Sequence, residues 1–171
     1  MHTVFILMGV SGCGKTLIGK KLAKEFAYQF IEGDDYHSLE NKKKMESGLA
    51  LDDKDRESWL ASLEECLSEL EESVVLSCSA LKRKYRKILN GNPCNTIFIH
   101  LDVTKNTLED RLNVRKGHFF NPVLLQDQLN VLEGLDPSEH GFSVNSDQNP
   151  EKIIADILSK LNDKKYEFQN A

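Results

Sequence analysis

A glycine-rich stretch, Gly9 to Thr16, constrains this chain more than any other part of it. Its sequence, GVSGCGKT, matches the phosphate-binding pattern GxxxxGK(S/T) at every specified position. An apolar run of strand length, Thr3 to Met8, precedes it, and apolar residues at helical spacing follow it. A strand, a glycine loop and a helix are the context in which this motif holds phosphates. The sequence therefore predicts a nucleoside triphosphate site at the start of an α/β fold.

Each part of this loop has an expected task. Glycines let successive backbone N–H groups turn toward the β-phosphate, and the helix that follows directs its positive end at the same anion. Lys15 is expected to reach the β- and γ-phosphates, and the Thr16 hydroxyl is expected to bind Mg²⁺. The Cys13 thiol is either sensitive to oxidation or a small side chain of little consequence. The predicted ATP-binding residues of the loop are Gly9, Val10, Ser11, Gly12, Cys13, Gly14, Lys15 and Thr16.

Length and charge narrow the class of protein. The 171 residues suit a single domain, expected over 1–163, with a frayed polar tail over 164–171. The net charge of -5 argues against nucleic acid or an anionic membrane as the partner, because both need a basic surface. No apolar stretch approaches the ~18 residues of a membrane span. We therefore expect a cytoplasmic protein.

Strand-like and helix-like segments alternate along the chain. After the first strand, apolar runs predict strands over 28–32, 74–78, 96–101 and 142–144. Helices are expected from Asp52 to Leu70, over 80–90, and from Thr104, Asn121 and Asn149 onward. In the helix over 80–90, the spacing places Ile88 on the core face and Arg86 on the solvated face. This alternation predicts a five-stranded, mostly parallel sheet flanked by helices on both faces, which is the P-loop NTPase fold.

Transfer of a phosphoryl group also needs a carboxylate on the acceptor side. Asp34 follows the second strand directly, at the sheet edge where open α/β folds place ligands. The alternative is that Asp34 and Asp35 only form a turn. His37 and His118 are each either substrate contacts or structural residues.

Cations on two helices are candidates for stabilising the transferred group and an anionic substrate. Arg111 and Arg115 share one helix face beside an aperiodic segment, so they lie either on a closing lid, at about 115–122, or on a solvated face. Lys82 and Arg86 come shortly after Ser79 at a strand end, where an anionic substrate would meet them. A solvated helix face is again the alternative.

The chain resembles the P-loop gluconokinases of the shikimate-kinase and adenylate-kinase-like group. The matching segments are GVSGCGKT, GDDYHSLENKKKMESGLALDD, DRESWL, SCSALKRKYR, and RLNVRKGHF continuing through LLQDQLNVLE. They occur in the family's order from Phe5 to Glu133. The resemblance implies ATP-dependent phosphorylation of D-gluconate on its terminal hydroxyl, with Mg²⁺, in an adenylate-kinase-like fold with a lid and as a possible homodimer.

The resemblance assigns roles to the candidate site residues named above. The resemblance implies that Asp34 is the acceptor-side carboxylate and that Arg111 and Arg115 are lid arginines that bind ATP. Lys15, Asp34 and Arg115 are then the expected catalytic residues. The implied gluconate contacts are Asp34, His37, Ser79, Lys82, Arg86 and His118.

Two alternatives remain. One is another small-molecule kinase of the same fold, such as a shikimate kinase, although Ser79-Ala80-Leu81 stands where that enzyme has a glycine-rich turn. The other is a nucleotide-dependent switch without an acceptor. The chain lacks the NKxD and DxxG motifs of GTPase switches, which argues against this second alternative.

Overall fold

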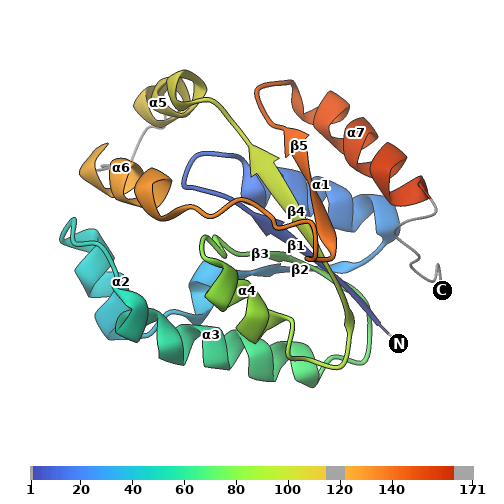
Figure 1. Ribbon diagram of the computed structural model, residues 1–171, viewed down its shortest axis with the longest axis horizontal. Helices are drawn as coiled ribbons and strands as arrows, with labels where there is room; N and C mark the ends of the chain where they lie inside the picture. The colour runs from blue at the N-terminus through green and yellow to red at the C-terminus, as the bar shows by residue number, and fades with distance from the viewer. Residues whose placement is uncertain (1, 115–121, 164–171) are drawn as a thin grey trace.

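A computed structural model describes residues 2–114 and 122–163 of the chain. The predicted alternation of strands and helices is present within these ranges (Figure 1). The strands are β1 (Thr3–Met8), β2 (Gln29–Glu32), β3 (Val74–Ser77), β4 (Asn95–Asp102) and β5 (Gly141–Asn145). The helices are α1 (Lys15–Phe26), the 3₁₀ turn η1 (Gly33–Tyr36), α2 (Leu39–Glu46), α3 (Asp53–Ser68), α4 (Arg83–Leu89), α5 (Lys105–Val114), α6 (Pro122–Val131) and α7 (Pro150–Asn162).

The five strands form one sheet in the order β2-β3-β1-β4-β5. Every neighbouring pair is parallel, with Phe5 of β1 beside Val75 of β3 on one side and Ile97 of β4 on the other. All six residues of β1 are buried, as expected for a central strand covered on both faces. The prediction of a parallel sheet with helices on both faces is confirmed.

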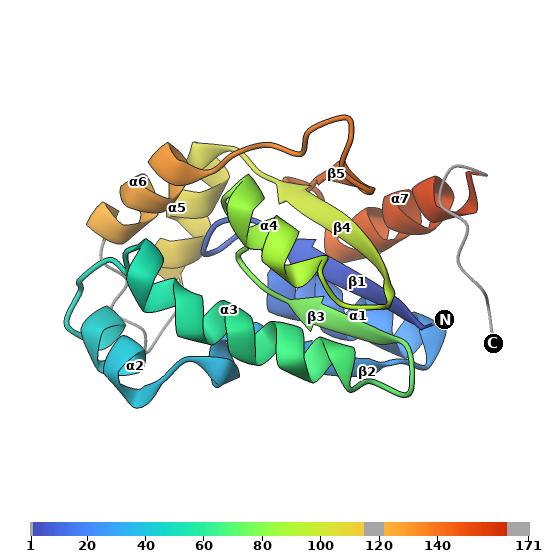
Figure 2. The same cartoon turned by 60° about the horizontal axis from the view of Figure 1, so that its bottom comes forward.

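Two hydrophobic cores lie on opposite faces of the sheet. One contains Phe5 and Leu7 of β1 together with apolar residues of α1 and α7, and the other contains Val4 and Ile6 with residues of α3 and α4. In Figure 2, α3 and α4 lie in front of the sheet and α1 and α7 lie behind it. The helices α2, α5 and α6 gather at one end, toward which β4 points (Figure 2). This end is where a parallel sheet of this kind places its ligands.

Side-chain caps set several helix starts where the sequence predicted them. Asp52 accepts a hydrogen bond from the N–H of Asp55, whose carboxylate accepts one from the N–H of Asp52, which makes a reciprocal capping box. Asn149 caps α7, and Pro150 occupies its first turn. The predicted helix cap at Asn121, the lid and the tail lie outside the described residues, apart from Pro122.

The helix predicted over 80–90 is shorter than expected and turned on its axis. It begins at Arg83, because Ala80 has a positive φ of 43° and Lys82 is extended. Two predictions for its faces are wrong. Ile88 is 39% exposed, whereas the Arg86 side chain is 1% exposed.

Within the described residues, none of the helices combines the length and the apolar character that crossing a bilayer requires.

Candidate active site

The glycine loop connects β1 to α1 in a conformation that requires glycine. Gly9, Gly12 and Gly14 have φ values of 138°, 84° and 104°, in the region that other residues rarely adopt. Gly14 is the N-cap of α1, and no side chain caps the helix there. The first N–H groups of α1 are therefore left to bind an anion.

Lys15 lies folded over this loop. Its Nζ donates to the carbonyl oxygens of Gly9 and Val10, both at 3.0 Å. Cys13 beneath it is fully buried, which favours the view that its side chain fills space. An ammonium group held at the mouth of a ring of backbone N–H groups is placed to meet phosphate oxygens.

Neighbouring segments hold the loop from three sides. The N–H of Gly9 donates to the carbonyl of Ser79, 3.2 Å away, just after β3. The Ser146 hydroxyl donates to the carbonyl of Cys13 at 2.7 Å. Arg111 of α5 donates to that same carbonyl at 3.3 Å and to the carbonyl of Ser146 at 2.6 Å. Arg111 thus braces the loop and joins it to the segment after β5.

One N–H of the loop is already occupied. Ser11 donates its backbone N–H to the side-chain oxygen of Gln128, on α6, at 2.6 Å. An amide oxygen therefore stands where a phosphate oxygen would be expected to bind.

The hydroxyl of Thr16 and the end of β2 meet beside the loop. Thr16 donates through Oγ1 to Oε2 of Glu32 at 2.7 Å. A hydroxyl and a carboxylate are both hard oxygen donors, of the kind that Mg²⁺ prefers.

Asp34 lies in η1, directly after β2, and its side chain is 71% exposed. The turn approaches β3 closely, because a Cβ on Gly33 would lie 2.4 Å from the carbonyl oxygen of Ser77. Trp59 of α3 donates its indole N–H to the carbonyl of Gly33 at 2.8 Å. A glycine and a buried indole therefore fix the backbone that presents the Asp34 carboxylate.

A pocket of about 830 Å³ joins the loop to Asp34. Ser11 and Lys15 line it together with Asp34, His37 and Ser79, so five of the predicted site residues share one cavity. Residues of α2, α3, α5 and α6 complete its wall, among them Arg56, Trp59, Leu112, Asp127 and Gln128.

The comparisons with known proteins agree with this geometry. The family model described as shikimate kinase matches residues 11–162. The gluconokinase of Arabidopsis thaliana is 38% identical, with 92% of this chain and 92% of that protein covered. The crystal structure of a gluconokinase from Sinorhizobium meliloti 1021 superposes with a TM-score of 0.86 at 40% identity, covering 93% of this chain and 91% of the other. The chain belongs to the gluconokinase family.

Similarity to shikimate kinases is more distant. The shikimate kinase structure from Bacteroides thetaiotaomicron has a TM-score of 0.66 at 19% identity, with 93% and 98% of the two chains covered. That likeness shows the shared fold, which the family model also detects. As a member of the gluconokinase family the protein is a kinase, with ATP as its co-substrate.

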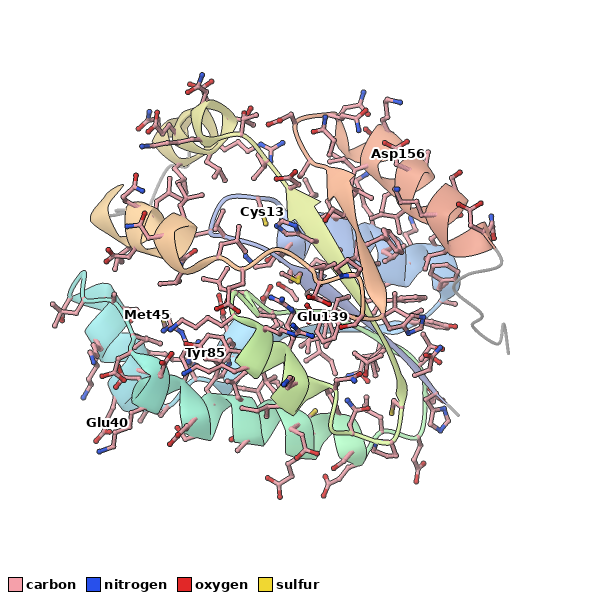
Figure 3. All side chains as sticks on the ribbon, in the orientation of Figure 1. Cys13, Glu40, Met45, Tyr85, Glu139 and Asp156 are labelled. Atoms are coloured by element: carbon pink, nitrogen blue, oxygen red, sulfur yellow. The ribbon has the colours of Figure 1, made fainter. Side chains whose placement is uncertain are left out.

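Lys82 and Arg86, predicted as gluconate contacts, do not line this pocket. Lys82 pairs with Asp53 at 2.8 Å. The Arg86 side chain is buried instead, and its Nε and Nη2 donate to the two carboxylate oxygens of Glu139 at 2.6 and 2.8 Å. Figure 3 labels Glu139 in the interior of the molecule. We correct the prediction for Arg86, because a buried guanidinium that is fully engaged cannot also face a substrate. Arg115 and His118 lie outside the described residues.

Sequence reasoning missed Arg56, Trp59 and Gln128. Arg56 lies in the first turn of α3, donates to the carbonyls of Leu51 and Asp52, and lies over the Tyr85 ring with its guanidinium carbon 5.7 Å from the ring centroid. Arg56 and Trp59 belong to the segment DRESWL, whose match to the family was a signal that could have found both. Gln128 belongs to another matching segment, LLQDQLNVLE, but its contact with Ser11 spans 117 positions of sequence and could not be inferred from that match.

Proposed function

We propose that the protein transfers the γ-phosphoryl group of ATP to the terminal hydroxyl of D-gluconate, giving 6-phospho-D-gluconate and ADP. The observation that carries the proposal is the single pocket that Ser11 and Lys15 of the phosphate loop share with Asp34. In this reaction the hydroxyl oxygen bonds to phosphorus, the bond from phosphorus to the ADP oxygen breaks, and the hydroxyl proton leaves. Asp34 accepts that proton or orients the hydroxyl.

Lys15 and the N–H groups of the loop stabilise the negative charge on the phosphates. Because Lys15 now donates to two loop carbonyls, it must exchange these contacts for phosphate oxygens when ATP binds. Arg111 keeps the loop in shape through the carbonyl of Cys13. The predicted lid arginine Arg115 would add a second cation over the transferred group.

The residues present fit Mg²⁺. Thr16 and Glu32 offer two oxygen donors within 2.7 Å of each other, and Mg²⁺ commonly takes one or two protein oxygens together with phosphates and water. In the described part of the chain, no group of three or more His, Cys, Asp or Glu side chains could form a metal site built from protein alone. When bound with ATP, the ion would neutralise charge on the β- and γ-phosphates. Thr16 and Glu32 would hold it, directly or through water.

Arg56 is the residue we assign to the gluconate carboxylate. It lines the same pocket as Asp34, His37 and Ser79, and its side chain presents more N–H groups than its contacts with Leu51 and Asp52 use. A planar guanidinium matches a carboxylate in two parallel hydrogen bonds. Ser79 would then contact a hydroxyl group between the two ends of gluconate, and His37, whose side chain is 4% exposed, would act on the substrate through Asp34. The possible homodimer and the gluconate contacts at Lys82 and His118 stay predictions.

A coupled assay of ADP release with Mg·ATP tests the proposal over gluconate, shikimate, AMP and no acceptor. We expect release only with gluconate. Release only with shikimate would keep the fold and overturn the acceptor, and equal release without an acceptor would favour the nucleotide switch.

The role of Asp34 has a matched control on the next residue. Asp34→Asn should keep ATP binding and lose turnover, by about 100-fold or more, because general bases contribute 10²–10⁴-fold. Asp35→Asn should keep turnover, because Asp35 is outside the pocket lining. Normal turnover in Asp34→Asn would overturn the role of this carboxylate.

A further inference from the structure

His37 is a buried imidazole between three partners, with its side chain 4% exposed. Its ring stacks on Trp59 with 4.2 Å between centroids and 15° between planes. Its Nδ1 lies 3.5 Å from Nδ2 of Asn41, and its Nε2 lies 4.0 Å from Oδ1 of Asp34. The stack leaves only the ring edges free to form hydrogen bonds, so each nitrogen has one neighbour that decides its role.

The side-chain orientation of Asn41 follows from a second contact. Asn41 is 5% exposed on α2, and its Nδ2 lies 2.6 Å from the backbone carbonyl oxygen of Asp55. A carbonyl oxygen only accepts, so the atom facing it must be the NH₂ group of the amide. The same NH₂ group has a second hydrogen, which is directed to Nδ1 of His37.

This orientation selects one form of the neutral imidazole. A nitrogen that accepts a hydrogen bond from an amide N–H carries no proton itself, so Nδ1 is the acceptor and Nε2 carries the proton. The Nε2–H group then faces the carboxylate of Asp34. In the other tautomer, the Nε2 lone pair would face that carboxylate and repel it.

We propose that Asn41 is a positioning residue for phosphoryl transfer, which holds His37 in the tautomer that directs Nε2–H at Asp34. This proposal rests on the proposed function of Asp34. His37 orients Asp34 through Oδ1 and leaves Oδ2 for the acceptor hydroxyl. The distance of 4.0 Å shortens to a hydrogen bond when the acceptor binds, as hydrogen bonds in active sites commonly do.

Burial and the nearby positive charges keep the His37 ring neutral. Burial, followed by the positive charges of Arg56 and Lys42, lowers the pKa of His37 to about 4. Asp34 is the carboxylate that faces Nε2, and it is mostly exposed to solvent. At neutral pH the two side chains are therefore not an ion pair, and the tautomer decides how they interact.

The wild-type protein gives the first test, without any assay of turnover. A two-bond ¹H–¹⁵N correlation spectrum at pH 7 should show His37 with a protonated Nε2 and an unprotonated Nδ1. The His37→Gln variant assigns the signal by its loss. A protonated Nδ1, or a charged ring, would overturn the proposal and would leave gluconate phosphorylation untouched.

A substitution then tests whether Asn41 sets this state. Asn41→Leu has a similar shape but no donor, so we expect the Nδ1-protonated form to appear in the spectrum. We also expect kcat to fall about tenfold or more, because a misplacement of about 1 Å at a reacting group can cost about 100-fold, while KM for ATP stays unchanged. Glu40→Gln is the matched control, since Glu40 is exposed on the outer side of α2 and should change neither readout (Figure 3).

A double substitution separates positioning from simple loss of structure. Glutamine in place of His37 keeps a donor NH₂ group near the position of Nε2, and its state does not depend on Asn41. In the His37→Gln background, Asn41→Leu should therefore lower kcat by less than twofold. An equal loss of kcat in both backgrounds, or an unchanged tautomer in Asn41→Leu, would refute the proposal.

Discussion

Replacing Arg86 by methionine should destabilise the protein strongly, because this arginine is buried with its charge paired. Besides its two hydrogen bonds to Glu139, it donates to the carbonyls of Ala80, Glu133 and Gly134 at 3.0 to 3.1 Å. These contacts tie the start of α4 to the segment between α6 and β5. Methionine fills much of the volume but leaves the carboxylate and the three carbonyls without this donor.

The size of the effect follows from the burial of the pair. The side chains of Arg86 and Glu139 are 1% and 12% exposed, so after the substitution water can replace few of the hydrogen bonds that Arg86 made. Removal of one partner of a buried ion pair costs about 3–5 kcal/mol. In a chain of this length, that loss lowers Tm by about 6–20 °C.

Urea and thermal unfolding of Arg86→Met, with Lys87→Met as the control, measure this loss. Lys87 is exposed on the same helix, so its replacement should change the free energy of unfolding by less than about 0.5 kcal/mol. Arg86→Lys, which is expected to retain more stability, should keep KM for gluconate within about twofold of wild type. An Arg86→Met variant of wild-type stability with a raised KM for gluconate would refute the structural role.

Three further predictions concern the helices around the site. The pKa of His37 is about 4 in the folded protein, below its ordinary value of 6.5. The unfolded chain therefore binds a proton at His37 more readily than the folded protein does. The free energy of unfolding is highest above pH 6.5 and decreases by about 3 kcal/mol as the pH falls toward 4. Unfolding at pH 7 and pH 4.5 should show a smaller loss for His37→Gln than for wild type, and an equal loss would contradict the shifted pKa. Gln128→Ala frees the backbone N–H of Ser11 for ATP, so the Kd for ATP measured by calorimetry should fall about fivefold, which corresponds to one hydrogen bond. The control Gln126→Ala, at an exposed position, should keep the wild-type Kd. Weaker binding of ATP by Gln128→Ala would mean that Gln128 also contacts bound ATP. Asp52→Ala removes the cap of α3 and should cost about 1 kcal/mol in urea unfolding, and an unchanged midpoint would mean that the cap contributes nothing.

Local patterns were enough to predict most of the fold. The apolar run of β1, the glycine loop and the caps at Asp52 and Asn149 each depend on neighbouring residues, so the sequence displays them directly. Placement of Asp34 beside the loop followed from the rule that parallel strands end at one edge of the sheet. The prediction for the helix over 80–90 was wrong in its start and in its buried face. The positive φ at Ala80 moves the start of the helix toward the C-terminus and so changes which side chains face the core.

Side-chain roles in the site depended on contacts between distant segments. From the sequence, Arg86 was predicted to be a cation near a strand end. Its pairing with the largely buried carboxylate of Glu139, 53 positions later, gives it a structural role. His37 was a lone histidine until the fold stacked it on Trp59 and placed Asn41 at its Nδ1.

The sequence by itself determined the nucleotide loop, the parallel α/β architecture and the candidate carboxylate at Asp34, because the glycine pattern and the alternation of strands and helices are local features of the chain. Only the tertiary structure decided which cations face the pocket and which face the core. Charge, tautomer and burial are set by whatever lies within a few ångströms in space, and in this chain those neighbours come from other helices.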